Sequence, residues 1–189
     1  MGKHRFTVSK ASNFTVRSIT SRRRRRCFTN NEQETRKMKN PMPVQFGTPA
    51  DIREWMKLIE EISPQFPGLQ TPAETDDHRQ TVLRFMGKQQ ALCVKDGDTV
   101  AGVLLISRKR NMLCCLAVSP RYRRRGIASM LIEEALRQLD RTKDITVSTF
   151  REDDEKGTAP RALYKKFGFV EDELTVELGY PNQKFILHP

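Results

Sequence analysis

The segment from Ser119 to Leu131 has the residue types and spacing of a phosphate-binding loop. An apolar run, Met112–Val118, precedes it and a strongly helical stretch follows. A loop between a buried strand and a helix start presents backbone N–H groups at the positive end of the helix dipole. The three arginines Arg123–Arg125 add charge there, and Gly126 and the small Ala128 let an anion approach closely. The sequence therefore predicts a phosphate site at this helix start.

Apolar periodicity predicts one mixed α/β domain over residues 43–189. Thr48 can cap a helix, Pro49 suits its first turn and Asp51 closes a capping box. We expect helices over about 49–62, 77–86, 127–139 and 159–167, and strands over 44–46, 91–95, 99–107, 112–118, 144–150, 169–170, 174–178 and 184–187.

The order of these elements predicts how they connect. Asp96-Gly97-Asp98, between two apolar runs, is typical of a hairpin turn, and the polar turn 108–111 continues an antiparallel meander. Strand 112–118, helix 127–139 and strand 144–150 then form a right-handed crossover. This crossover makes the two strands parallel neighbours.

Three features follow one another along the chain. They are the strand end Leu116–Pro120, the spacing Arg123-x-x-Gly126-x-Ala128, and a helix with Leu163-Tyr164 that leaves through Gly168-Phe169. Together they resemble the GNAT superfamily of acyl-CoA-dependent N-acetyltransferases, in its bacterial-type, single-domain form. The resemblance covers residues from about 43 to 189. It implies an α/β (α+β) fold with a mixed sheet, in which an antiparallel meander leads into a parallel β-α-β crossover with a splayed central strand pair.

The resemblance also implies where acetyl-CoA would bind as a co-substrate. The loop would hold the pyrophosphate, and the pantetheine amides would pair with the open edge of the preceding strand. A solvated basic turn and an ordinary core strand are the alternative interpretations of these segments. The implied binding residues are Leu116, Ala117, Val118, Arg123, Arg124, Arg125, Gly126, Ile127, Ala128 and Ser129.

Acyl transfer needs a neutral amine, a polarised carbonyl and a proton for the departing thiolate. The resemblance gives the proton to Tyr164, because a phenol with a pKa near ~10 can protonate a thiolate whose thiol has a pKa near ~8.5. Packing with a satisfied hydroxyl is the alternative role. A backbone N–H in Leu116–Val118 would stabilise the oxyanion. The general base stays open among Glu60, Glu61, His78, the acidic loop Glu152–Glu155 and a water chain.

Two further features bear on the site. Cys114 and Cys115 alternate on a strand, so one of them would lie near the thioester as a nucleophile, unless both are inert core residues. Many family members carry an asparagine seven residues before the tyrosine, where this chain has Gly157, a residue with no side chain to make that contact. Segments 149–157 and 66–69 are expected to shape the acceptor pocket, as the corresponding loops do in the family.

These observations predict an N-acetyltransferase that moves an acetyl group from acetyl-CoA to a primary amine by direct attack in a ternary complex. We expect no metal, an acceptor that is a small molecule or a peptide, and a monomer or homodimer. The alternative is a non-catalytic acyl-CoA-binding sensor or regulatory module. The four cysteines have no zinc spacing, and no stretch of about 18 apolar residues is present, so we expect no membrane partner and a cytoplasmic location.

Residues 1–42 form a basic leader that we expect to be disordered. Residues 1–40 hold twelve Lys or Arg and two Glu, whereas residues 41–189 hold 22 Lys or Arg and 21 Asp or Glu. The net charge of +11 therefore comes mainly from the leader, and nucleic acid is expected as a partner only through it. The leader is interpreted as a presequence, a polyanion-binding arm, or an incidental extension before a start at Met38 or Met42.

Overall fold

The computed structural model describes residues 42–66 and 68–189, and its strands join one mixed sheet of seven strands in the order β1-β2-β3-β4-β5-β7-β6. Residues 1–41 of the predicted leader, 1–42, lie outside the described residues, whereas Met42 packs against the core of the domain. The strands are β1 (Val44–Phe46), β2 (Ala91–Asp96), β3 (Thr99–Ser107), β4 (Met112–Val118), β5 (Ile145–Phe150), β6 (Val170–Glu177) and β7 (Tyr180–Leu187).

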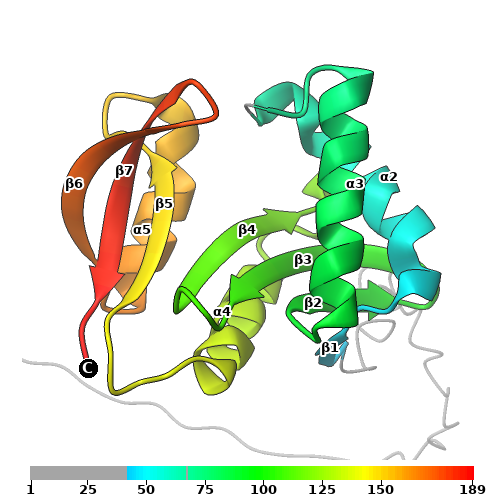
Figure 1. Ribbon diagram of the computed structural model, residues 1–189, viewed down its shortest axis with the longest axis horizontal. Helices are drawn as coiled ribbons and strands as arrows, with labels where there is room; N and C mark the ends of the chain where they lie inside the picture. Colours follow the sequence, from blue (N-terminus) through cyan, green and yellow to red (C-terminus); the bar gives the residue numbers. More distant parts are fainter. Residues whose placement is uncertain (1–41, 67) are drawn as a thin grey trace, which may run out of the picture. The chain divides into compact units, whose positions relative to one another are not determined.

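Helices cover both faces of the sheet (Figure 1). Helices α2 (Ile52–Ile62) and α3 (Pro72–Gly87) lie on one face, and α4 (Ile127–Gln138) and α5 (Thr158–Lys166) lie on the other. No helix in the described ranges is long and apolar enough to cross a membrane. The mixed α/β order and the crossover through α4 are as the sequence predicts.

Each face has its own hydrophobic core. Trp55 and Ile59 of α2 are fully buried in a cluster that also holds residues of α3 and the sheet. On the opposite face, Leu131 of α4 and Phe185 of β7 are fully buried in a cluster that also holds Tyr164 of α5. The two cores hold the sheet from both sides, so its strands can separate locally without loss of the fold.

Helix α3 begins at Pro72, earlier than the predicted start at 77, so this boundary was wrong. Thr71 caps the helix: its N–H donates to Glu74 Oε2 at 2.9 Å, and its hydroxyl oxygen accepts from the Glu74 N–H at 3.2 Å. Thr71-Pro72 and Glu74 therefore repeat the cap pattern of Thr48-Pro49 and Asp51. Val82 and Met86 of this helix are buried, and Leu83 is half-buried.

The last strands differ from the prediction. Segments 169–170 and 174–178 are not two strands, because one strand, β6, runs through the acidic residues between them with a bulge, and β7 starts at Tyr180 rather than at 184. An edge strand tolerates these acids because cations meet them. Glu171 lies 2.6 Å from both Arg161 Nη2 and Lys165 Nζ, and Lys184 pairs with Asp172 and Glu173.

The Glu171→Gln variant should be less stable by about 1 kcal/mol at neutral pH. Arg161 is buried and its charge loses its carboxylate partner, although the one-third exposure of the Glu171 side chain reduces the effect below the ~1.5–3 kcal/mol of a buried charged hydrogen bond. Lys165 and Arg161 hold the pKa of Glu171 below its ordinary value of 4.5. The stabilisation is therefore present above pH 4.5 and is lost as the pH falls through the lowered folded pKa.

Urea unfolding of both proteins across acidic and neutral pH measures this difference. Glu173→Gln is the matched control, because Glu173 is exposed and Lys184 keeps Asp172 as a partner. A stability gap between Glu171→Gln and the unchanged protein that persists below the folded pKa would contradict the assigned charge effect.

Strands β4 and β5 pair for only two positions, Met112 with Thr146 and Leu113 with Val147. On its other side β4 stays paired with β3 as far as Val118. The β4 edge from Cys114 to Val118 therefore has no strand partner on the β5 side, and the predicted splaying of these two strands is confirmed (Figure 1).

A β-bulge at Cys114 reverses the alternation of side chains along β4. Leu105 pairs with Cys115 and Ile106 with Leu113, so Cys114 is the extra residue. Leu113 consequently packs in the α4–α5 core together with Leu116, whereas Cys115 packs against the α2–α3 core. Simple alternation would place Leu113 and Cys115 on the same face.

The start of α4 lies directly over Gly102 of β3. A Cβ at Gly102 would meet Ile127 Cγ2 at 2.5 Å and Leu131 Cδ1 at 3.3 Å. We expect Gly102→Ala to lower the free energy of unfolding by about 1–3 kcal/mol through overpacking, as measured by denaturant unfolding. Gly87→Ala is the control, because a Cβ there meets nothing within 4 Å. Equal effects of the two substitutions would contradict the close packing of α4 on Gly102.

Candidate functional site

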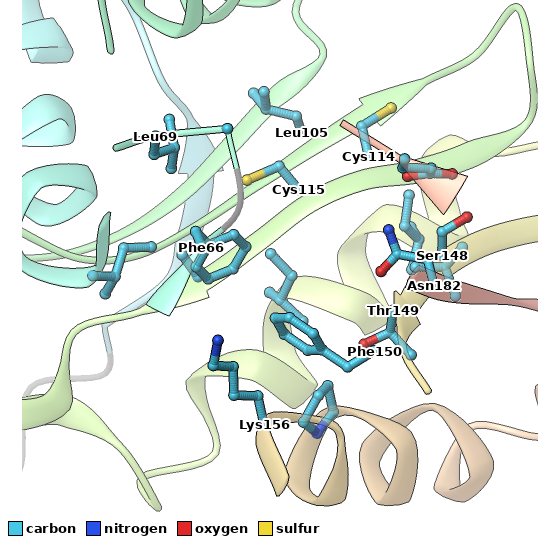
Figure 2. A pocket seen from close by; sticks show the side chains of 18 of the residues that line it. Phe66, Leu69, Leu105, Cys114, Cys115, Ser148, Thr149, Phe150, Lys156 and Asn182 are labelled. Atoms are coloured by element: carbon cyan, nitrogen blue, oxygen red, sulfur yellow. The ribbon is translucent and has the colours of Figure 1, made fainter. Parts of the chain in front are cut away.

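A cavity of about 670 Å³ lies where β4 and β5 separate (Figure 2). Its walls include Leu113 and Leu163 from one core and Ile62 and Leu105 from the other, so the cavity crosses the sheet through the gap. Most of this wall is apolar. Polar groups reach it from α3, from the loop after β4, from the segment between β5 and α5, and from the β6–β7 hairpin.

Tyr164 lines this cavity from α5. Its side chain is 4% exposed, and its ring packs against those of Phe169 at 5.8 Å and Phe185 at 6.2 Å. Burial raises the pKa of Tyr164 well above its ordinary value, so the phenol keeps its proton at neutral pH. The hydroxyl has no hydrogen-bond partner within residues 42–66 and 68–189. It can therefore donate to a group that enters the cavity.

The unpaired edge of β4 forms another part of the cavity wall. Leu116, Ala117 and Val118 all line the cavity, and their backbone groups that point away from β3 have no strand partner among the described residues. An extended chain that carries amide groups can complete such an edge. The predicted strand edge and Tyr164 are thus brought together by the structure.

The predicted phosphate loop forms the N-terminus of α4. A short 3₁₀ turn, Pro120–Tyr122, precedes it, and Gly126 caps the helix with φ +81°, in the left-handed region that favours glycine. The Gly126 oxygen accepts the first helical bond from the Met130 N–H at 3.0 Å. The N–H groups of residues 127–129 lie before that bond, at the positive end of the helix dipole. A Cβ on Gly126 meets nothing within 4 Å, so the cap faces open space.

The loop side chains have different surroundings. Arg123 lines the cavity, whereas Arg124, with φ +60°, and Arg125 are exposed outside it. The Arg125 guanidinium lies 5.1 Å from the ring centroid of Tyr122, whose hydroxyl donates to Asp96 Oδ2 at 3.0 Å.

The helix residues of the predicted set also differ among themselves. The Ile127 side chain is in the core, so only its backbone is available to a ligand, and Ala128 and Ser129 are half-buried. None of residues 124–129 lines the cavity itself. The predicted binding residues therefore form two groups. Residues 116–118 and 123 line the cavity, and residues 124–129 lie at the N-terminus of α4, outside it.

The candidate general bases differ in whether they line the cavity. Glu60 and Glu61 are exposed and do not line the cavity, and Glu61 lies 3.7 Å from Arg121 Nε. From the acidic loop, only Glu155 lines it. His78 of α3 lines it as well, and its buried Nε2 has no hydrogen-bond partner in the described part of the chain. Burial lowers the pKa of His78, so its imidazole is neutral at pH 7, the form that accepts a proton.

Cys114 and Cys115 both line the cavity (Figure 2). Burial raises the pKa of the Cys114 thiol to about 11 and that of Cys115 to about 12. Since the thiolate is the nucleophile, these values disfavour nucleophilic catalysis by either residue at neutral pH.

Both segments that are expected to shape the acceptor pocket, 66–69 and 149–157, contribute residues to the same cavity. Phe66, Gly68 and Leu69 lie on one side, and Phe150 packs edge to face on Phe66 at 6.4 Å from the other (Figure 2). At Gly157, a Cβ would lie 2.6 Å from the Arg151 carbonyl oxygen. The chain approaches itself closely there, which accounts for a glycine in place of the larger asparagine.

Sequence reasoning missed the polar residues that the β6–β7 hairpin supplies. The polar residues Glu177 and Asn182 line the cavity. Leu178 lines it as well and packs against Gly68. The turn signal at Leu178-Gly179 marks the hairpin, but only the pairing of β7 beside β5 brings it to the cavity.

Residues 87–171, from the end of α3 into β6, match the family model for an acetyltransferase (GNAT) domain. The chain contains a GNAT acetyltransferase domain. The matched segment holds β4, the loop and Tyr164, and the resemblance seen in the sequence is confirmed. None of the curated protein sequences matches the chain.

Solved structures share the fold of this GNAT domain. A GNAT-family acetyltransferase from Bacillus cereus superposes with a TM-score of 0.60 at 19% identity, over 77% of this chain and 95% of that one. An N-acetyltransferase from Staphylococcus aureus gives 0.61 at 17%, over 76% and 99%. The PaiA N-acetyltransferase from Thermoplasma acidophilum, in complex with coenzyme A, gives 0.57 at 14%, over 77% and 98%. The predicted fold class is confirmed.

Proposed function

We propose that the protein transfers an acetyl group from acetyl-CoA to a primary amine, by direct attack in a ternary complex. The observation that carries the proposal is one cavity lined both by Tyr164, whose hydroxyl is protonated and unpartnered, and by the unpaired edge of β4. The GNAT domain and the coenzyme A complex of the PaiA enzyme support the choice of donor.

The chain provides a site for each part of the donor. The helix terminus at Gly126, with N–H groups, an open approach and arginines around it, fits a pyrophosphate. The edge of Leu116–Val118 fits an extended arm with amide groups, which would run from the cradle toward the closed end of the gap at Leu113. A bound acetyl-CoA supplies an activated thioester carbonyl.

The residues around the reacting atoms divide the chemistry. A backbone N–H of Leu116–Val118 polarises the carbonyl oxygen, and Tyr164 donates the proton that the departing thiolate requires. Of the candidate bases, His78 is the best placed, because it lines the cavity with a neutral imidazole and an unpartnered Nε2. Glu155 is the other cavity-lining carboxylate of the candidate set.

Release of free thiol from acetyl-CoA, measured over a panel of small amines and peptides with a free N-terminus or lysine, tests the proposal. Amine-dependent release with sequential kinetics is the expected result. Calorimetry on the same protein measures binding of acetyl-CoA separately. Tight binding without turnover on any amine would favour the sensor alternative, and absence of binding would contradict both.

A further inference from the structure

Lys156, an exposed residue, lines the cavity and carries an amine. It lies in the short 3₁₀ turn Glu155–Gly157 before α5, and Figure 2 shows its side chain directed toward the space between Phe66 and Phe150. The ammonium nitrogen is 5.8 Å from the ring centroid of Phe150 and 5.4 Å from that of Tyr180. In the part of the chain that the structure describes, this nitrogen forms no ion pair or hydrogen bond.

The backbone at Lys156 is held firmly. Asp154 Oδ1 accepts the Lys156 N–H at 2.9 Å, and Asp154 Oδ2 accepts the Tyr180 hydroxyl at 2.6 Å. One carboxylate thus fixes both the lysine and a ring over which its nitrogen lies. Close packing of Gly157 against the Arg151 carbonyl, and the bond from Arg161 Nη1 to the Phe150 oxygen at 3.3 Å, secure the same segment.

Lys156 and Tyr164 belong to one continuous helical segment. Lys156 precedes Tyr164 by about two turns, or roughly 12 Å along the axis at ~1.5 Å per residue. Helical side chains tilt toward the N-terminus, so the Tyr164 side chain leans toward the Lys156 end. Both line the cavity, and Tyr164 marks where a thioester would react. The lysine therefore reaches the same cavity as Tyr164, from the N-terminal end of this segment.

We infer that Lys156 is itself an acetyl acceptor, so that the protein acetylates its own cavity when no other amine is present. The inference rests on the proposed function. The deprotonated Nζ attacks the thioester carbonyl of acetyl-CoA, the new C–N bond forms and the C–S bond breaks. After the attack the amine nitrogen gives its proton to water, the thiolate takes a proton from Tyr164 and leaves as the thiol, and the Tyr164 phenolate recovers a proton from water. The product is N-acetyl-lysine and free coenzyme A, and no redox partner is required.

Acetylation changes the cavity that an external amine must enter. It removes the positive charge over Phe150 and Tyr180 and adds an acetyl group to the space between Phe66 and Phe150. A soluble amine and Lys156 would therefore compete for one acetyl donor and one position. An acceptor at saturating concentration should protect Lys156.

The same helix offers matched control lysines. Lys165 is 52% exposed and paired with Glu171 at 2.6 Å, and Lys166 is exposed; neither lines the cavity. All three amines meet the same acetyl-CoA in solution. Lys156 is exposed as well, so spontaneous acetylation by acetyl-CoA in solution would modify Lys166 about as fast as Lys156.

The full chain, incubated with acetyl-CoA and no added amine, is digested and the peptides that contain these three lysines are quantified by mass spectrometry over time. We expect Lys156 to gain an acetyl group at least about tenfold faster than Lys165 or Lys166, which is ~1.4 kcal/mol in barrier. The rate constant should not change on dilution of the protein. Lys156→Arg should remove the modification, Lys165→Arg should leave it unchanged, and Tyr164→Phe should slow it.

Two outcomes would overturn the inference, and they are distinguishable. Turnover on external amines with Lys156 unmodified, or modified no faster than Lys165 and Lys166, removes the self-acetylation and leaves the proposed function intact. Absence of both acetyl-CoA binding and amine turnover removes the proposed function, and the self-acetylation with it.

Discussion

The Gly126→Glu variant is expected to bind acetyl-CoA at least about 100-fold more weakly than the unchanged protein, a loss of ~2.7 kcal/mol. Gly126 has φ +81° and faces open space at the start of α4, so the new side chain would project into the position proposed for the pyrophosphate. Its negative charge would repel the phosphates. The same charge is favourable for the helix dipole, so the helix start itself should not be lost through charge.

Isothermal calorimetry with acetyl-CoA measures this loss. Gly97→Glu is the matched control, because Gly97 also has a positive φ, +59°, and a Cβ there also meets nothing within 4 Å. Gly97 belongs to the β2–β3 turn, so that variant carries similar backbone strain at a different place. Near-normal affinity of Gly126→Glu, or an equal loss in Gly97→Glu, would exclude the helix terminus as the phosphate cradle.

The Tyr164→Phe variant should lose about 10²- to 10⁴-fold in kcat, the usual contribution of a positioned general acid. The substitution removes only the hydroxyl, which has no hydrogen-bond partner among the described residues. The departing thiolate would then take its proton from water. Binding of acetyl-CoA should change little, because binding is assigned to the β4 edge and the α4 terminus.

Steady-state kinetics with a responsive amine, together with a thermal melt, test this prediction. Phenylalanine keeps the ring contacts with Phe169 at 5.8 Å and Phe185 at 6.2 Å, so the melting temperature should stay the same. An unchanged kcat would assign Tyr164 to packing alone. A fall in kcat together with a large fall in melting temperature would also assign Tyr164 to packing.

Local signals in the sequence predicted most of the fold. Three elements are indicated by signals within their own residues: the β2–β3 hairpin by Asp96-Gly97-Asp98, the first helix by the cap at Thr48, and α4 by the change to a helical period at Ile127. Thr71 carried the same kind of cap signal for α3, and the sequence prediction passed over it. This boundary was thus predictable from the residues around Thr71.

Other features depend on pairing and could not be read from one segment. The bulge at Cys114 exists only relative to β3, and it decides which face Leu113 and Cys115 occupy. Likewise, the acidic residues within β6 made the strand look interrupted in the sequence. They are compatible with one continuous strand because α5 and β7 supply cations that pair with them. Neither the bulge in β4 nor the ion pairs of β6 can be predicted from the residues of that strand alone.

The candidate site shows the same division. The loop is predicted from its own residues, and the family resemblance implies the role proposed for Tyr164, because both belong to short continuous segments. The positions of His78, Lys156 and Glu177 relative to them follow from the separation of β4 and β5, which opens one cavity to three distant segments. Contacts between segments so far apart in the chain do not produce a repeating pattern in the sequence, so they could not be predicted from it.

The separation of β4 and β5 also sets a length. It begins beyond the pair Leu113–Val147 and extends along Cys114–Val118, about five residues or roughly 16 Å at ~3.3 Å per residue. A donor whose phosphates lie at Gly126 needs an arm of that reach to bring its reactive end to the closed end of the gap. A shorter donor can occupy the helix terminus or the closed end, but not both. Under the proposed function, the protein would select its donor by the length of the donor's arm as well as by its charge.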